Sequence, residues 1–199
     1  MLYLDMLRKW GQVYNITSVR KAEEVVETHL LDSLALINPL RRYLESKDSV
    51  IEQELRMLDV GSGAGLPGVV LAVCMPELHV TCVDAVAKKA AFVQQVAWSL
   101  KAANIESRHS RVENLSGMYP LITSRAFASL ADFTRLTSEL LAPAGAWVAM
   151  KGRLPPEEMA DLPPQVHVFH VEPLQIPGKD VQRCLVWMEH MADGRSENC

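Results

Sequence analysis

A series of glycines, in the first third of the chain, follows an apolar run that contains one acidic residue. Asp59 lies in the run, and Gly61, Gly63, Gly65 and Gly68 come close behind it. Glycine adopts positive φ without strain and has no side chain, so such a loop lets the backbone approach a ligand closely. The last three glycines fit the G-x-G-x-x-G pattern of dinucleotide sites. The acidic residue with the first three glycines fits the D-x-G-x-G-x-G loop of S-adenosylmethionine (SAM) methyltransferases. The loop therefore predicts a nucleotide-like ligand of one of these two kinds.

A second acidic residue, Asp84, ends the next apolar run, about 20 residues behind the loop. A carboxylate at this place accepts the ribose hydroxyls of either ligand. Asp59 favours SAM, because its negative charge would repel a pyrophosphate but could engage the ammonium or sulfonium of SAM through water or backbone. The alternative is an NAD(P)-dependent oxidoreductase, which shares the fold but requires a Tyr-x-x-x-Lys pair or a histidine in the crevice. We expect neither this pair nor such a histidine in the crevice of this protein.

The elements that position these residues follow from the alternation of short apolar runs with longer amphipathic stretches behind residue 55. The runs predict strands over 56–60, 79–83, 105–110, 121–124, 146–151, 166–172 and 183–189. Helices are predicted over 1–13, 22–43, 67–73, 87–103 and 130–141, and a polar connector over 46–54. The alternation indicates an α/β fold whose mostly parallel, seven-stranded, Rossmann-like sheet is covered on both faces. The last two strands should form an antiparallel hairpin.

The composition bounds the domain organisation and the compartment. A chain of 199 residues with 49% apolar content can form one full core. We expect an N-terminal helical cap over 1–54, a ligand-binding domain over 55–192 and a disordered tail over 193–199. The four cysteines lack C-x-x-C spacing and are expected to be reduced thiols. The start does not resemble a signal peptide, and the longest apolar stretch is too short to span a bilayer. A cytoplasmic protein is the expectation.

Two basic residues at the ends of predicted strands are candidates for contact with ligand and substrate. Arg125 follows the strand over 121–124, and its planar fork could bind the SAM carboxylate or the O6/N7 edge of guanine. Lys151 ends the next strand and is a similar candidate for a base or phosphate of RNA. A surface salt bridge is the alternative role for both residues.

Further basic residues could contact RNA locally. The net charge is −4, so the protein has no overall basic field, and a nucleic acid would require a local patch. Lys88 and Lys89 open the helix over 87–103, at the end where the helix dipole disfavours cations. This indicates phosphate binding, with an ordinary solvated pair as the alternative. A basic rim around the crevice would also include Arg111, Arg153 and Lys179.

One polar group lies in the N-terminal third. His29, Asp32 and Ser33 share one face of the helix predicted over 22–43. They offer too few ligands for a metal ion, and we predict no metal site. A polar cluster that anchors the helix to the remainder of the protein is favoured, and positioning of the substrate is the alternative.

Several longer motifs resemble one bacterial family, the 16S ribosomal RNA (guanine-N7)-methyltransferases, also called RsmG or glucose-inhibited division protein B. The resemblance spans residues 2–189 and is carried by Trp10…Tyr14-Asn15-Ile16-Thr17-Ser18, His29-Leu30-Leu31-Asp32-Ser33, Asp59-Val60-Gly61-Ser62-Gly63-Ala64-Gly65-Leu66-Pro67-Gly68, Ser110-Arg111-Val112-Glu113, Ser124-Arg125-Ala126-Phe127-Ala128 and Lys151-Gly152. It implies a class I SAM-dependent methyltransferase fold and methylation of guanine 527 of 16S rRNA in the small ribosomal subunit. The resemblance also implies SAM contacts at Gly61, Leu66, Val112, Glu113 and Arg125, beside Gly63, Gly65 and Asp84. The chain departs from the family pattern at Ala85, where serine is common.

The implied reaction requires little of the protein beyond alignment. N7 of guanine carries an in-plane lone pair and no proton, so methyl transfer needs neither a general base nor a covalent intermediate. Cys74 and Cys82 are accordingly expected in the core rather than as nucleophiles. A ribosome-assembly factor with a vestigial SAM pocket is the non-catalytic alternative, which the intact glycines and Asp84 disfavour. Whether naked rRNA or an assembled small subunit is the substrate stays open.

Overall fold

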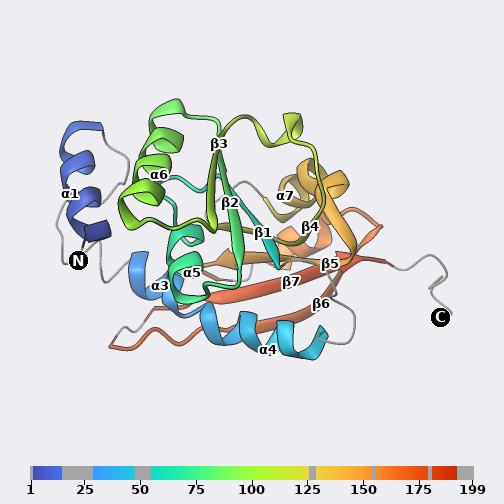
Figure 1. The fold of residues 1–199 in the computed structure, drawn as a ribbon. Coiled ribbons are helices and arrows are strands. Elements are labelled where there is room, and N and C mark those ends of the chain that lie inside the picture. Colours follow the sequence, from blue (N-terminus) through green and yellow to red (C-terminus); the bar gives the residue numbers. More distant parts are fainter. Residues whose placement is uncertain are drawn as a thin grey trace, which may run out of the picture.

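The structure, a computed structural model, describes residues 2–14, 29–47, 55–125, 129–153, 156–178 and 181–191. Its centre is a seven-stranded sheet of order β3-β2-β1-β4-β5-β7-β6 (Figure 1). The strands are β1 (Arg56–Val60), β2 (His79–Asp84), β3 (Ile105–His109), β4 (Tyr119–Arg125), β5 (Leu141–Lys151), β6 (Val166–Pro173) and β7 (Cys184–His190). β7 runs antiparallel to β5 and β6, and the other strands pair in parallel. The predicted seven-stranded, mostly parallel sheet and its final hairpin are confirmed.

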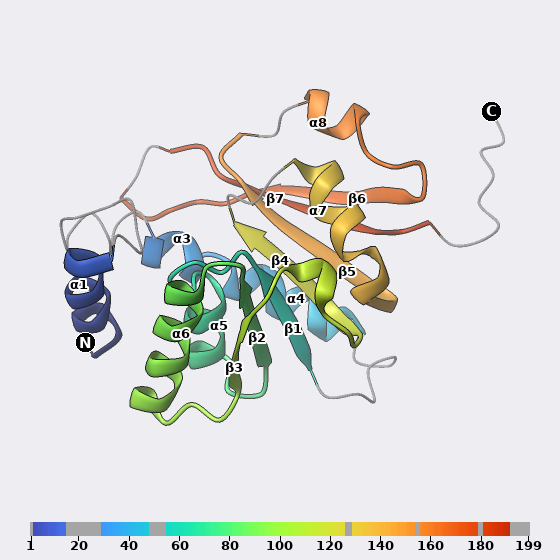
Figure 2. The same cartoon turned by 90° about the horizontal axis from the view of Figure 1, so that it is seen from above.

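The helices cover the sheet on both faces (Figure 2). They are α1 (Leu2–Tyr14), α3 (Leu31–Leu34), α4 (Ile37–Lys47), α5 (Gly68–Cys74), α6 (Ala87–Leu100), α7 (Leu130–Thr137) and α8 (Pro156–Ala160), with the 3₁₀ helices η2 (Val112–Asn114) and η3 (Ser138–Leu140). α1 lies beside α6 in both views, and α7 and α8 lie on the face opposite to α5 and α6.

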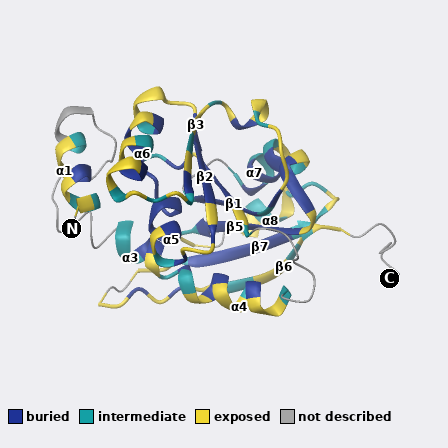
Figure 3. Ribbon diagram, viewed as in Figure 1, coloured by how far each residue is buried: buried dark blue, intermediate teal, exposed yellow. Residues whose placement is uncertain are grey.

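Alternate residues of the inner strands β1, β2, β4, β5 and β7 enter two separate core clusters, one on each face of the sheet. Met57 of β1 packs with α1, α4, α5 and α6, whereas Leu58 packs with α7. In the same way Trp187 faces the first cluster and Val186 the second. The central strands are dark along their length in Figure 3, because both of their faces are covered. This burial explains why these strands are nearly continuous apolar runs in the sequence.

The register brings three predicted site segments to one edge of the sheet. Val60, the last residue of β1, pairs with Val83 of β2 and with Ser124 of β4. The glycine loop, Asp84 and Arg125 therefore follow neighbouring strands at their C-terminal ends. The strand order reverses on either side of β1, and ligands of open α/β sheets bind at such a switch point.

The prediction of one continuous helix over 22–43 is wrong in the part that the structure describes. Residues 22–28 lie outside the described residues, and the remainder divides at Ala35 and Leu36 into α3 and α4. Pro39 explains the break, because its nitrogen carries no hydrogen and cannot donate to the carbonyl four residues back. α4 then continues to Lys47, so the predicted polar connector begins later than residue 46.

Two further helix ends differ from the prediction. The helix predicted over 87–103 ends at Leu100, because Lys101 adopts a left-handed conformation that closes the helix. The helix predicted over 130–141 ends at Thr137, and Leu141 already opens β5. The sequence analysis also missed α8, whose five residues are too few to show a helical period.

The division of the chain at residue 54 stays a prediction, and the tail over 193–199 lies outside the described residues. Met6 of α1 and Leu40 of α4 pack in the same cluster as residues of the sheet. Within the described ranges, no helix has the length and apolar character needed to cross a membrane.

Candidate functional site

The glycine loop between β1 and α5 is held in a conformation that favours glycine. Gly61, Gly63 and Gly65 have φ values of 66°, 59° and 81°, in the left-handed region that residues with side chains rarely adopt. Gly61 N–H donates to the Val83 carbonyl over 2.9 Å, which fixes the loop to the end of β2. From α1, the Tyr3 hydroxyl donates to the Ala64 carbonyl over 2.8 Å. The loop is thus tied both to the sheet and to the N-terminal helix.

Asp59 lies beneath this loop rather than on its surface. Its exposed fraction is 0%, and its Oδ2 accepts the Gly68 N–H over 2.8 Å. Burial raises the pKa of the Asp59 carboxyl to about 7, and the Gly68 hydrogen bond opposes this shift. Asp59 is therefore sealed behind the loop, where it holds the first turn of α5, and the predicted engagement of SAM through water or backbone stays a prediction.

Gly68 is required by this close approach. A Cβ at residue 68 would lie 2.7 Å from Asp59 Oδ2 and 2.7 Å from Cys82 Sγ. Both neighbours are buried at 0–1% exposure and have little room to move. The G-L-P-G extension of the loop thus has a packing reason, because the backbone of α5 passes directly over the Asp59 side chain.

We expect Gly68→Ala to lower the free energy of unfolding by about 1–3 kcal/mol, because the methyl group overpacks the contact with Asp59 and Cys82. Gly11→Ala is the matched control: Gly11 lies within α1, and a Cβ there meets nothing within 4 Å. It should raise stability by about 0.5–1 kcal/mol. Urea unfolding of both variants measures the difference. Equal stability of Gly68→Ala and the unchanged protein would contradict the packing account.

Asp84 connects the loop to the start of α6. Its Oδ2 accepts the Gly63 N–H over 2.9 Å, and its Oδ1 accepts the Val86 N–H over 2.8 Å. Lys89 Nζ lies 3.8 Å from Oδ2. A carboxylate oxygen has more than one acceptor position, so both oxygens can also accept hydroxyl groups. The predicted ribose contact is compatible with this geometry and stays a prediction.

A cleft of about 250 Å³ opens beside Asp84, between the ends of β1 and β2 and the segment behind β3. It is lined by Val60, Gly61, Val83, Asp84, Ala85, Ser110, Arg111, Val112, Glu113 and Leu136. The cleft brings together four of the predicted cofactor residues, namely Gly61, Asp84, Val112 and Glu113, and the bond to Asp84 adds Gly63. The predicted residues Gly65, Leu66 and Arg125 do not line it. Leu66 packs in the core at 3% exposure, so a ligand contact there would fall to its backbone.

The sequence analysis missed the apolar walls of this cleft. Val60 and Val83 end the two strands that lead into the site, and this position could have indicated their role. Leu136 comes from α7, more than 50 residues further along the chain, and no local pattern marks it. These side chains give the cleft an apolar interior, and its charged lining residues are Asp84, Arg111 and Glu113.

Arg125 ends β4 at the same edge of the sheet and is half-buried. Its Nη1 lies 2.9 Å from Nδ1 of His29, in the polar group that the sequence placed on one helix face. The two other members of that group have different partners. Asp32 accepts a hydrogen bond from Arg183 Nε over 3.1 Å, and Ser33 Oγ donates to the His29 carbonyl over 2.7 Å.

Lys151, at the end of β5, is paired within the protein. Its Nζ lies 2.7 Å from Glu158 Oε2 of α8, and the same oxygen accepts the Leu130 N–H over 2.9 Å. Glu158 was missed by the sequence analysis because α8 was missed. Contact of Lys151 with the substrate stays a prediction, and it would require exchange of this partner.

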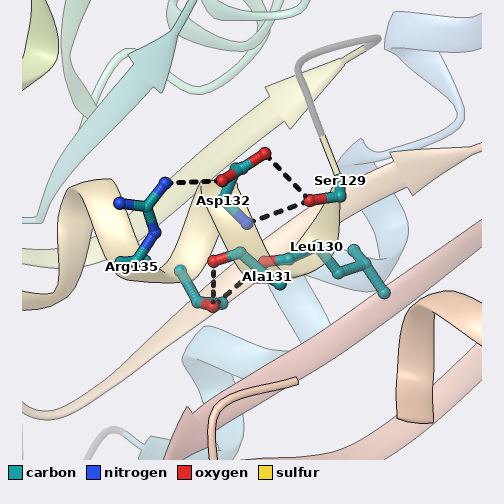
Figure 4. A network of polar contacts seen from close by, with 6 residues as sticks. Ser129, Leu130, Ala131, Asp132 and Arg135 are labelled. Carbon is teal, nitrogen blue, oxygen red and sulfur yellow. Dashed lines mark hydrogen bonds and ion pairs between the residues drawn. The ribbon is translucent and has the colours of Figure 1, made fainter. Parts of the chain in front are cut away.

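The α7 helix is fixed shortly behind Arg125 by its own cap (Figure 4). Ser129 Oγ accepts the Asp132 N–H over 3.1 Å, and Arg135 Nη2 lies 2.6 Å from Asp132 Oδ1. The hydroxyl of Thr134 donates to the Leu130 carbonyl over 3.0 Å. A capped first turn of this kind stabilises the helix by about 1 kcal/mol. The cap therefore fixes the start of α7, the helix that connects β4 with β5.

Most of the basic residues that we predicted around the crevice are exposed, among those that the structure describes. Lys88, Arg111 and Arg153 are exposed, and Lys89 is half-buried beside Asp84. Lys179 lies outside the described residues. Among the described residues, no three metal-ligating side chains gather into a group that could hold an ion.

One Tyr-x-x-x-Lys spacing lies outside the crevice. Tyr43 and Lys47 carry it on α4. The Tyr43 ring stacks on Trp187 with 4.9 Å between the ring centroids, against β7 rather than beside the glycine loop. The pair is therefore part of the packing of α4 on the sheet.

Comparison with solved structures agrees with the sheet topology. TrmN from Thermus thermophilus aligns with a TM-score of 0.60 at 20% identity, over 76% of this chain and 48% of TrmN. The N-methyltransferase NodS from Bradyrhizobium japonicum, in complex with S-adenosyl-L-homocysteine, aligns with a TM-score of 0.59 at 14% identity. That alignment covers 83% of this chain and 90% of NodS. At these identities the likeness concerns the fold, which is that of class I methyltransferases.

Comparison of the sequence is more specific. The family model described as rRNA small subunit methyltransferase G matches residues 1–186. Ribosomal RNA small subunit methyltransferase G from Albidiferax ferrireducens is 58% identical over 194 residues, which cover 96% of this chain and 87% of that protein. With a fold and a glycine loop that agree, the chain belongs to the rRNA small subunit methyltransferase G family.

Proposed function

We propose that this protein transfers a methyl group from SAM to N7 of guanine 527 in the 16S rRNA of the small ribosomal subunit. Membership of the rRNA small subunit methyltransferase G family supports the rRNA substrate. The observation that carries the proposal is the cleft at the switch point, where the glycine loop, Asp84 and the Val112-Glu113 turn meet. The cytoplasm, where small subunits are assembled, is the proposed compartment.

The residues of the cleft fit the adenosine part of SAM. The side chains of Val60, Val83 and Leu136 offer an apolar enclosure for a flat base. Asp84 lies at the rim with acceptor positions for ribose hydroxyls. Val112 and Glu113 open a 3₁₀ turn, where backbone N–H groups have no partner within the helix. The cleft would thus offer apolar walls and backbone N–H donors to an adenine base, and the Asp84 carboxylate to a ribose.

When bound, SAM supplies an electrophilic methyl group on a sulfonium, which the N7 lone pair accepts in line while the C–S bonding pair stays on sulfur. Guanine N7 has no proton to lose, so the protein needs no general base. The loop and Asp84 hold the donor, and Arg125 directs its planar fork at the same edge of the sheet. In this proposal Arg125 contacts the donor carboxylate or the O6 edge of guanine, and Lys151 contacts RNA. The contribution of these residues is alignment.

The exposed cations near the cleft are proposed to bind RNA phosphates. Lys88 opens α6 at the C-terminal edge of the sheet, and Arg111 lines the cleft. Arg153 lies just behind β5 at the same edge. In this proposal these residues act as a local basic group on a protein of net charge −4. RNA binding through such a group depends strongly on salt.

We expect Lys88→Ala to weaken rRNA binding and to lower the slope of log K against log salt by about 1, with SAM affinity unchanged. Lys101→Gly is the matched control, because Lys101 caps the opposite end of α6 in a left-handed conformation that glycine adopts easily. Binding isotherms at several salt concentrations make the comparison. A normal slope in Lys88→Ala would assign Lys88 to the solvated surface.

The proposed function is tested by incubating the protein with tritium-labelled SAM and small ribosomal subunits, or with the naked 16S rRNA. We expect label in the small-subunit rRNA of at least one of these substrates and none in large-subunit rRNA. SAM binding by calorimetry without any transfer of label would support the assembly-factor alternative. Tighter binding of NADH than of SAM would contradict the cofactor assignment.

A further inference from the structure

The half-buried Arg125 has a neutral hydrogen-bond partner, where an arginine removed from water usually has an anion. Its Nη1 lies 2.9 Å from His29 Nδ1. A guanidinium carries only donors, so the imidazole nitrogen must accept this hydrogen bond and cannot itself carry a proton. The contact therefore fixes His29 as the tautomer with its proton on Nε2.

The nearby carboxylate has a different partner. Asp32 lies three residues from His29 and is 5% exposed, yet its Oδ2 accepts from Arg183 Nε over 3.1 Å. Among the described residues, no carboxylate lies within ion-pair distance of Arg125. Asp32 forms its ion pair with Arg183, and from beyond ion-pair distance its charge and that of Asp59 favour the charged form of Arg125.

The environment keeps His29 neutral. Burial and the Arg125 charge lower the pKa of His29 to about 4, against the opposing influence of Asp32. The backbone at His29 is held by Ser33, whose hydroxyl donates to the His29 carbonyl over 2.7 Å. Burial also lowers the pKa of Arg125, but an arginine stays charged at neutral pH.

We propose that His29 is a positioning residue for Arg125: it orients the guanidinium through one hydrogen bond and leaves the charge free for the methyl donor or the guanine. A carboxylate at residue 29 would form a bidentate ion pair and compete with these ligands. A neutral acceptor fixes the direction of the fork without neutralising it. This inference rests on the proposed function, in which Arg125 contacts one of the reacting molecules.

Three substitutions separate orientation from charge. His29→Gln keeps a neutral acceptor, His29→Leu removes the acceptor, and His29→Asp adds an anion. We expect kcat/KM for methyl transfer to fall by less than about threefold in the Gln variant and by about tenfold in the Leu variant. The fall should reach about 100-fold in the Asp variant. Ser46→Ala is the control, because the exposed Ser46 hydroxyl makes the same kind of bond, to the Tyr43 carbonyl of α4.

A second measurement detects the contact between His29 and Arg125 without measuring catalysis. In ¹⁵N-labelled protein, the imidazole shifts of His29 should show an unprotonated Nδ1 and a protonated Nε2 down to about pH 5, and Arg125→Ala should abolish this preference. Thermal unfolding of each variant shows that the comparison concerns folded protein.

The outcomes distinguish the inference from the proposed function. Equal kcat/KM in His29→Asp and His29→Gln, or a doubly protonated His29 at pH 7 in the unchanged protein, would overturn the positioning role alone. Absence of methyl transfer by the unchanged protein would overturn the proposed function and, with it, this role.

Discussion

Asp84→Ala is expected to raise the Kd of SAM by roughly 5- to 150-fold, which corresponds to about 1–3 kcal/mol. The carboxylate accepts the Gly63 and Val86 N–H groups and lies at the rim of the cleft. Its removal therefore deprives the proposed ribose contact of its acceptors and also frees the loop from α6. Calorimetric titration with SAM measures the effect.

Asp84→Asn separates the two contributions of Asp84. The asparagine side chain keeps one oxygen acceptor, so it can hold one of the two backbone N–H groups but loses the charge. We expect an intermediate Kd for this variant. Asp161→Ala, at the exposed end of α8, is the control for the loss of one carboxylate. An unchanged SAM Kd in Asp84→Ala would refute the assignment of the cleft to the ribose.

Arg125→Ala is expected to lower kcat for methyl transfer by about 100-fold, because the reaction relies on alignment of the donor and the base. Arg125→Lys should recover little of this loss, since an ammonium cannot reproduce the planar fork. Single-turnover rates at saturating SAM and rRNA separate this effect from weakened binding.

Arg135→Ala provides the matched control for Arg125. The Arg135 guanidinium is exposed on α7 and pairs with Asp132 over 2.6 Å. It belongs to the cap of that helix and not to the cleft lining. A kcat that falls equally in Arg125→Ala and Arg135→Ala would indicate that α7 and the end of β4 matter only for stability.

The sheet and the loop could be predicted from the sequence because their signals are local. β1 has the predicted bounds, and six other strands begin or end within a few residues of their predictions. Parallel strands that are buried on both faces read as apolar runs, and the glycines that follow β1 sit at positive φ. The same local signal failed for the helix ends, which depend on Pro39 and on the left-handed Lys101.

The contacts of the site could not be predicted, because they join distant segments. His29 and Arg125 are 96 residues apart, and Asp32 and Arg183 are 151 apart. No spacing rule connects such pairs, and only the fold brings His29 and the following α3 to the end of β4 and the start of β7. Asp59 shows the converse: its place in the motif indicated a ligand, but its burial makes it a support for the loop.

The most direct measurement identifies the nucleoside that the protein methylates. Small subunits that lack the modification are incubated with the protein and labelled SAM, and the 16S rRNA is digested and analysed by mass spectrometry. The account predicts N7-methylguanosine, located at guanine 527, because transfer to the N7 lone pair requires alignment and no general base. Methylated cytidine, or a purine methylated at N2 or N6, would contradict it.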